Sequence, residues 1–222
     1  MIKKLKHVAV IPARKGSVGF PKKNQIFFDI TADFLSHLSW FDEVIVTSND
    51  EVVLDKAKKR EYTVYERSEI LSGPDISIKS VFKDLTCSFK MENDIVIWLF
   101  YLPILYKKYS DFEEAKTMIE KIEIKSLCSF IPAITHPFNT WRYNSQNKML
   151  IQYVKNNIYR RQDLPSAWMH YHYLCCFKPI ELENLNDELL NSKTHPFFLS
   201  KECAKNLIEI DTPEDFEKWK KN

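Results

Sequence analysis

The chain has 222 residues, of which 45% are apolar and 28% are charged, and its net charge is +2. We expect a soluble globular fold with a sizeable core, which excludes a disordered tail, a fibrous repeat and a peptide scaffold. Its 32 basic and 30 acidic side chains are spread along the sequence. Because they form no basic block, nucleic acid is not an expected partner.

The cysteines and the apolar runs indicate where the protein works. No two of the five cysteines have the spacing of metal ligands, so we expect free thiols in a reducing compartment. The apolar runs at residues 7–13 and 95–105 are too short for a signal peptide core or a membrane span. The sequence therefore predicts a cytoplasmic protein with no membrane partner.

Short β-branched runs alternate with helical patterns through the first half of the chain. This alternation is typical of an α/β fold with a largely parallel sheet. It predicts strands over residues 7–11, 43–47, 62–65, 94–100 and 126–131, and helices over residues 31–40, 51–60, 76–90 and 110–124. Ligands bind at the carboxyl ends of such strands, so we expect the chemistry in the loops after the first, second and fourth strands.

The second half of the chain starts with a break in this pattern. Residues 135–164 are rich in Asn, Gln, Tyr and Arg, and they predict a small protruding subdomain inserted in a single domain of residues 1–222. The elements expected after it are a strand at 171–178, a helix at 181–191, a strand at 207–210 and a C-terminal helix. Thr212 is expected to be the N-cap of that last helix, with Pro213 at its first position.

The most informative segment is residues 11–24, IPARKGSVGFPKKN. Glycine averages about 7% of residues in proteins, yet this chain has only three, and two of them lie here. Glycine turns expose backbone N–H groups, and the surrounding basic side chains suit a polyphosphate: Arg14, Lys15, Lys22 and Lys23. The spacing matches neither a P-loop nor the dinucleotide fingerprint. The alternative is a solvated basic loop.

This segment resembles the N-terminal signature of the acylneuraminate cytidylyltransferase family, I-P-A-R-x-G-S-x-G-x-P-x-K-N, at every fixed position. The resemblance implies a three-layer, Rossmann-like nucleotidyltransferase fold that uses CTP and Mg²⁺. It also implies that Arg14 and Lys23 are catalytic. The residues expected to bind CTP are Arg14, Gly16, Ser17, Lys22, Lys23 and Asn24.

Two further segments extend the resemblance. Residues 66–71 are similar to a stretch in which an arginine, here Arg67, reaches the nucleotide; taken alone, Arg67 would be a surface arginine. Residues 159–165 match the signature R-R-Q-D-L-P, in which Arg160, Arg161 and Gln162 would hold the acidic sugar. A guanidinium group suits a carboxylate, but a plain charged loop is the alternative for this segment.

Residues 208–216 are similar to the family's D-I-D-T-x-x-D-F. On a strand, Glu209 and Asp211 would point to one face, where two carboxylates can hold Mg²⁺ against a triphosphate. The alternative is helix capping, which leaves Asp211 without a role. We therefore predict Asp211 as a metal ligand and catalytic residue, with Glu209 as the second ligand.

The departures from the family concern the sugar side. The family's L-Q-P-T-S-P-L-R is replaced by the apolar residues 98–105, and its N-G-A-I-Y by residues 171–175, YHYLC. Lys79 and Ser80 lie where the family often has an acidic residue. His170 and His172 would share a strand face, but without a third ligand we expect a packed or substrate-facing pair.

The resemblance predicts transfer of CMP from CTP to the anomeric hydroxyl of a sialic-like nonulosonic acid, with release of pyrophosphate. It also implies a homodimer formed through residues 135–164. Two alternatives stay open: a nucleotide-binding homologue with an altered acceptor or lost transfer activity, and a nucleotidyltransferase for a non-acidic sugar.

Overall fold

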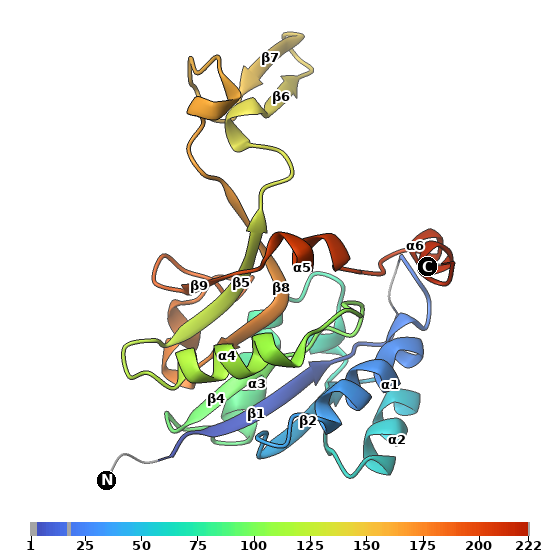
Figure 1. Cartoon of the computed structure of the whole chain (residues 1–222). Coiled ribbons are helices and arrows are strands. Elements are labelled where there is room, and N and C mark those ends of the chain that lie inside the picture. The colour runs from blue at the N-terminus through green and yellow to red at the C-terminus, as the bar shows by residue number, and fades with distance from the viewer. Residues whose placement is uncertain (1–3, 17–18, 222) are drawn as a thin grey trace.

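The computed structural model describes residues 4–16 and 19–221. Its main feature is a seven-stranded sheet with the order β3-β2-β1-β4-β8-β5-β9 (Figure 1). Its strands are β1 Lys6–Pro12, β2 Glu43–Ser48, β3 Thr63–Glu66, β4 Ile95–Leu99, β5 Ser126–Pro132, β8 Trp168–Phe177 and β9 His195–Phe198. Only β8 runs antiparallel to its neighbours, β4 and β5. The expectation of a mostly parallel α/β sheet is confirmed.

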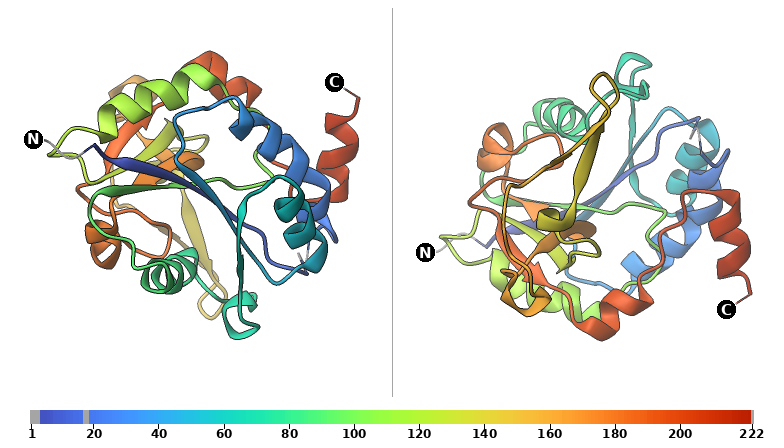
Figure 2. Two further views of the ribbon diagram at one scale, coloured as in Figure 1. Left: turned by 90° about the horizontal axis from the view of Figure 1, so that it is seen from below. Right: turned by 90° about the horizontal axis from the view of Figure 1, so that it is seen from above.

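Helices cover both faces of this sheet (Figure 2). The helices α1 Lys23–Ser36, α2 Glu51–Lys59 and α4 Tyr109–Ile119 bury Phe27, Ala57 and Phe112 in one core. Across the sheet, α3 Ile78–Ser88 buries Phe82 and Leu85 in a second core with Leu182. Because apolar residues on the two faces of the strands feed two separate cores, the fold has three layers, as expected.

Several element boundaries differ from the sequence prediction. Helix α1 begins at Lys23 instead of residue 31, because the left-handed Lys22 (φ 61°) turns the chain into the helix and Phe27 and Phe28 are buried on it. The helix predicted over residues 181–191 is wrong. A 3-10 helix, Pro179–Asn184, covers the start of this range, and a turn follows it. The turn is favoured because Asn186 Oδ1 accepts the backbone N–H groups of residues 188 and 190.

The predicted strand at residues 207–210 is also wrong. Glu209 makes only an isolated bridge with Ile104, and the segment is held by backbone hydrogen bonds to the loop after β4. Strand β9 and helix α5 Lys201–Asn206 were not predicted. The C-terminal helix α6 Pro213–Trp219 is confirmed: Thr212 is its N-cap, and Asp215 completes a capping box.

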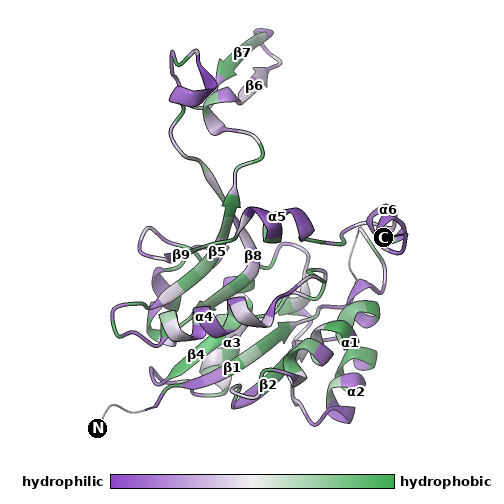
Figure 3. Cartoon of the chain, viewed as in Figure 1, coloured by the Kyte–Doolittle hydropathy of each residue, from purple (hydrophilic) through white to green (hydrophobic). Residues whose placement is uncertain are grey.

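Residues 135–164, hereafter the arm, extend away from the body in Figure 1. Strands β6 Trp141–Asn144 and β7 Met149–Gln152 pair there in a separate two-stranded sheet. Figure 3 shows apolar residues on β7, at a distance from both cores. Whether the arm is a dimerisation subdomain stays a prediction at this point. None of the helices in the described ranges is long and apolar enough to cross a membrane.

Candidate active site

The loop of residues 14–24 leaves the carboxyl end of β1 and is fastened at several points. Asn24 Nδ2 donates a hydrogen bond to the carbonyl of Arg14 at 2.9 Å, which ties the end of the loop to its start. Lys15 N–H donates to Asn49 Oδ1 at 2.7 Å, and Ser48 Oγ donates to the carbonyl of Ala13. The polar residues after β2 therefore shape the loop after β1. The predicted ligand Ser17 lies outside the described residues.

Two neighbouring cavities open on this loop and share Arg14, Lys23 and Asn24. One of about 330 Å³ is lined by the loop itself, including Gly16 and Lys22. Gly16 has the left-handed φ of +77° that favours glycine, and nothing lies within 4 Å of where its Cβ would be. The structure thus gathers five of the predicted nucleotide ligands around open backbone and cationic side chains.

The second cavity, of about 230 Å³, reaches toward α3 and the loop after β4. Besides the shared polar residues it is lined by apolar and aromatic side chains: Ile76, Ile78, Val81, Tyr101 and Pro103. Leu102 and Ile104 from the same loop are buried in the core. The residues of this segment are therefore partly structural, and Tyr101 and Pro103 are the ones that line the cavity.

Arg67 lies at the carboxyl end of β3 and is buried, with 6% of its surface exposed. Its Nη2 donates to the carbonyl of Thr47 at 3.0 Å. Burial, with a smaller contribution from the charge of Arg14, lowers the pKa of Arg67 to about 10. The group stays protonated at neutral pH, so two guanidinium groups are held near each other at this edge of the sheet. The alternative of a surface arginine is wrong, and the arrangement favours an anion.

Asp211 meets the loop from the C-terminal segment. Lys23 Nζ lies 2.8 Å from Asp211 Oδ1, and the lysine side chain is 13% exposed whereas the aspartate is 61% exposed. A Cβ on Gly19 would lie 2.8 Å from the backbone oxygen of Asp211, so only glycine fits this approach. The structure thus brings together residues 188 positions apart, although their catalytic roles stay predictions.

Glu209 is the second carboxylate near Lys23. Its neighbour Tyr171 was not predicted from the sequence as a site residue. Burial raises the pKa of Glu209, and the negative charge of Asp211 raises it further. A hydrogen bond from Tyr171 acts in the opposite direction. Tyr171 has a raised pKa through burial and the same glutamate. The only sequence signal for Tyr171 was that residues 171–175 depart from the family.

The carboxylate oxygens beside Lys23 are suitable ligands for Mg²⁺, because this ion takes oxygen ligands and is commonly held by one or two carboxylates together with substrate phosphates. Glu209 and Asp211 offer such carboxylates. The charge of Asp211 raises the pKa of Glu209, so the two groups repel each other and a cation between them would relieve that repulsion.

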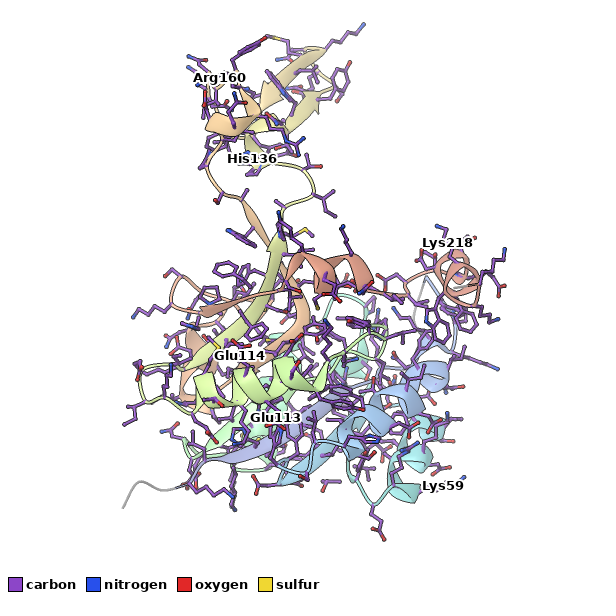
Figure 4. The ribbon with its side chains drawn as sticks, viewed as in Figure 1. Lys59, Glu113, Glu114, His136, Arg160 and Lys218 are labelled. Atoms are coloured by element: carbon purple, nitrogen blue, oxygen red, sulfur yellow. The ribbon has the colours of Figure 1, made fainter. Side chains whose placement is uncertain are left out.

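The predicted sugar ligands Arg160, Arg161 and Gln162 are not near the loop in this chain. They lie in the arm, and Figure 4 shows Arg160 at its far end, on the same side as His136. Arg160 forms two hydrogen bonds to Asp163, at 2.8 and 3.0 Å. Arg161 lines a separate cavity of about 520 Å³ with His136 and Pro165. Within one chain the structure gathers the residues predicted to bind the nucleotide and leaves these three residues apart.

Comparison with known proteins supports the sequence resemblance. No family model matches the chain. It is 23% identical over 221 residues to N-acylneuraminate cytidylyltransferases of Streptococcus agalactiae serotypes V and III. The match covers 96% of this chain and 52% of each relative, so the chain spans about half the length of the curated relatives it matches.

Solved structures match over almost the whole chain. CMP:2-keto-3-deoxy-manno-octonic acid synthetase complexed with CTP is 14% identical, with a TM-score of 0.69 and 97% of both chains covered. The 4-diphosphocytidyl-2C-methyl-D-erythritol synthase of Anaerococcus prevotii is 13% identical, with a TM-score of 0.60 over 98% of this chain and 99% of that chain. These likenesses confirm the nucleotidyltransferase fold. The chain thus resembles N-acylneuraminate cytidylyltransferases in sequence and has the fold of cytidylyltransferases.

Proposed function

We propose that the protein is a cytidylyltransferase that transfers CMP from CTP to a hydroxyl group of an acidic 2-keto sugar and releases pyrophosphate. One observation carries the proposal: Arg14, Lys23 and the buried Arg67 converge at the carboxyl ends of β1 and β3, beside Asp211. Three cations and open backbone at a glycine form a site for a triphosphate. The similarity to N-acylneuraminate cytidylyltransferases supports CTP as the nucleotide and a sialic-like acid as the acceptor.

The loop residues divide into groups that bind and groups that position. Arg14, Lys23 and Arg67 donate N–H groups to phosphate oxygens, and Gly16 leaves room for the phosphates to approach the backbone. Asn24 holds the loop closed through its bond to the carbonyl of Arg14, so we assign it a positioning role.

In the reaction the acceptor hydroxyl oxygen attacks the α-phosphorus of CTP. The bond from the α-phosphorus to the bridging oxygen breaks, and its electron pair leaves with pyrophosphate. Donors held in place by the fold stabilise this developing charge, and Lys23 is the donor best placed to do so. The hydroxyl proton passes to a carboxylate of the pair Glu209 and Asp211. A Mg²⁺ ion held by Glu209 and Asp211 would supply further neutralisation of the triphosphate charge.

The acceptor side requires a second copy of the chain. The arm exposes large apolar side chains: Trp141, Tyr143, Met149, Leu150, Tyr153 and Tyr159. A lone two-stranded sheet is marginally stable in water, and an apolar patch of this kind marks an interaction site. We propose a homodimer in which the arm of one subunit brings Arg160, Arg161 and Gln162 to the acceptor site of its partner, because they lie far from the loop of their own chain.

We also propose that the enzyme works in the cytoplasm. All five cysteines are free, and four of them are buried. A hydrogen bond with Cys128 and burial raise the pKa of the Cys175 thiol, which keeps it unreactive. Such thiols are typical of proteins in a reducing compartment.

A pyrophosphate-release assay tests the function. Each of the four NTPs is supplied with Mg²⁺, with and without a panel of 2-keto sugar acids, and with neutral aldoses as controls. We expect release only with CTP and an acid. CTP binding without turnover on any acid would favour the nucleotide-binding homologue, and turnover of GTP or UTP with a neutral sugar would favour the non-acidic acceptor.

A further inference from the structure

A cluster of metal-ligating groups lies beside the acceptor side and has no role in the function proposed above. Nε2 of His170 and Nδ1 of His172 lie 3.8 and 3.9 Å from the same atom, Oε2 of Glu188. One ligand atom from each of the three residues lies within 4.8 Å of the other two. Glu188 is the third ligand that the sequence did not reveal, because it follows His172 by 16 residues in a turn rather than in a recognisable motif.

The fold builds this cluster with a bulge in β8. Cys128 of β5 pairs with Cys175, but Phe130 pairs with His170, so β8 carries extra residues between these two pairs. Ser129 fills the bulge: its Oγ donates to the carbonyl of Tyr171 and accepts from the backbone N–H of Leu174. The bulge re-aims the side chains that a regular strand would have placed elsewhere.

The turn that carries Glu188 is fixed as well. Asn186 Oδ1 accepts the backbone N–H of Glu188 at 3.0 Å and that of Leu190 at 2.9 Å. The carbonyl oxygen of Glu188 lies 2.9 Å from Nε2 of His172. The Asn186 bonds thus fix the shape of the turn, and the bond from His172 holds the backbone of Glu188 against β8 before any ion binds.

The hydrogen bond of His172 decides which of its nitrogens is free. A carbonyl oxygen only accepts, so Nε2 carries the proton and Nδ1 keeps a lone pair. The Nδ1 lone pair therefore faces the carboxylate oxygen of Glu188 with no hydrogen between them. Histidines that bind metals have this arrangement: one ring nitrogen donates to a backbone carbonyl and the other binds the ion.

We propose that His170, His172 and Glu188 form a site for a divalent transition-metal ion of the Zn²⁺ and Co²⁺ class, separate from any Mg²⁺ at Glu209 and Asp211. Imidazole nitrogens select such ions, whereas Mg²⁺ prefers oxygen. In a tetrahedral zinc site with bonds of about 2.1 Å the ligand atoms lie about 3.4 Å apart. Closing the present separations requires only small rotations of His170 and Glu188, whose side chains are 39% and 58% exposed.

The site borders the cavity of about 230 Å³ beside the loop of residues 14–24. The ring of His172 contacts that of Tyr101 edge to face, with centroids 5.4 Å apart, and Tyr101 lines the cavity that Arg14 and Lys23 share. A bound ion would fix the ring of His172, against which the ring of Tyr101 packs. The competing set of Cys128, His172 and Cys175 is less suited, because the raised pKa of Cys175 opposes the thiolate that a metal needs.

Cobalt titration of the untagged, metal-stripped protein tests the site. We expect one Co²⁺ per chain, seen by its visible absorption and by calorimetry, displacement by Zn²⁺, and a rise in Tm with either ion. Glu188→Gln, His170→Gln and His172→Gln should each weaken binding by at least about tenfold. The matched controls Asp187→Asn and His37→Gln change an exposed carboxylate and an exposed histidine outside the cluster, and they should bind as the parent does.

The outcomes separate this site from the proposed reaction. Lys23→Ala should lower pyrophosphate release by about 10²- to 10³-fold and leave Co²⁺ binding unchanged. Absence of binding by the folded parent protein, or binding that survives Glu188→Gln and His170→Gln, overturns the proposal whatever the transferase assay shows. Circular dichroism of each variant excludes loss of binding through misfolding.

Discussion

The loop of residues 14–24 and the arm hold their polar side chains in opposite ways. The loop is enclosed by its own chain: Asn24 closes it, Asn49 supports it and Asp211 contacts Lys23 from the C-terminal segment. The arm holds its polar groups through bonds within itself, as from Asn156 to the carbonyl of Phe138 and from Arg160 to Asp163, and Trp141, Tyr143, Tyr153, Tyr159 and Arg160 are exposed. The cations proposed to hold the triphosphate come from the ends of β1 and β3, which flank β2 in one sheet, so one subunit can complete that site, whereas the residues expected to hold the sugar would need a partner to bring them to it.

The largest expected effect comes from a substitution in the loop of residues 14–24. Lys23→Ala removes the donor closest to the carboxylate pair, and we expect pyrophosphate release to fall by about 10²- to 10³-fold, as for other groups that stabilise developing charge. Stability should change little, because Asp211 is largely exposed and regains water. Lys59→Ala, on the exposed surface of α2, is the matched control (Figure 4). Full turnover in the Lys23 variant would show that the loop does not hold the triphosphate.

The arm is tested by complementation between subunits. We expect the double variant Arg160→Ala/Arg161→Ala to lose transfer through a raised KM for the acid while CTP affinity is kept. Coexpressed in equal amounts with Lys23→Ala, it should restore about a quarter of the wild-type sites, because in a twofold dimer half the molecules are mixed and each mixed dimer has one intact site. A mixed dimer that stays inactive, or an arm variant with normal KM, contradicts an acceptor site shared between subunits.

Gly19 offers a smaller change to the contact between the loop and the C-terminal segment. In Gly19→Ala the new methyl group would lie 2.8 Å from the backbone oxygen of Asp211, so the loop or that segment must move. We expect a loss of about 1–3 kcal/mol in unfolding free energy and weaker CTP binding, measured by denaturant titration and calorimetry. Gly73→Ala meets its nearest neighbour only at 3.4 Å and serves as the control. Equal effects of the two substitutions would mean that the approach to Asp211 is not required.

The smallest effect is a pH dependence at Glu209. The pKa of Glu209 is raised in the folded state above its ordinary value of about 4.3. Between these two pKa values the folded protein binds more protons than the unfolded chain does. Stability is therefore lost as pH rises through that window. Glu209→Gln should raise Tm at neutral pH by about 2 °C or less, and the gain should vanish below the window. Exposed Glu114→Gln on α4 is the control; a gain that does not depend on pH would show that the buried charge of Glu209 is not its cause.

Local patterns predicted much of the body of the molecule. Strands β1, β2 and β4 are apolar runs, and the Thr212 capping box is written in consecutive residues. Helix α1 was placed too late because the polar residues before Phe27 hid its first turn, and the expected strand at Glu209 is only a bridge to Ile104. These errors arise where tertiary contacts, and not the local period, decide the conformation.

The sequence by itself determined which loop we propose for the nucleotide, since a phosphate-binding loop needs fixed residue types at fixed spacing and the glycines and cations of residues 14–24 lie in one short segment. Only the tertiary structure decided what lies against that loop and what does not. It placed Tyr171 on Glu209 and Asp211 on Lys23, and it held Glu188 against two histidines through a bulge in β8. It also left Arg160 at the end of the arm. Such contacts join residues far apart in the chain, and no short pattern records them because they depend on how sheet, bulge and turns pack together.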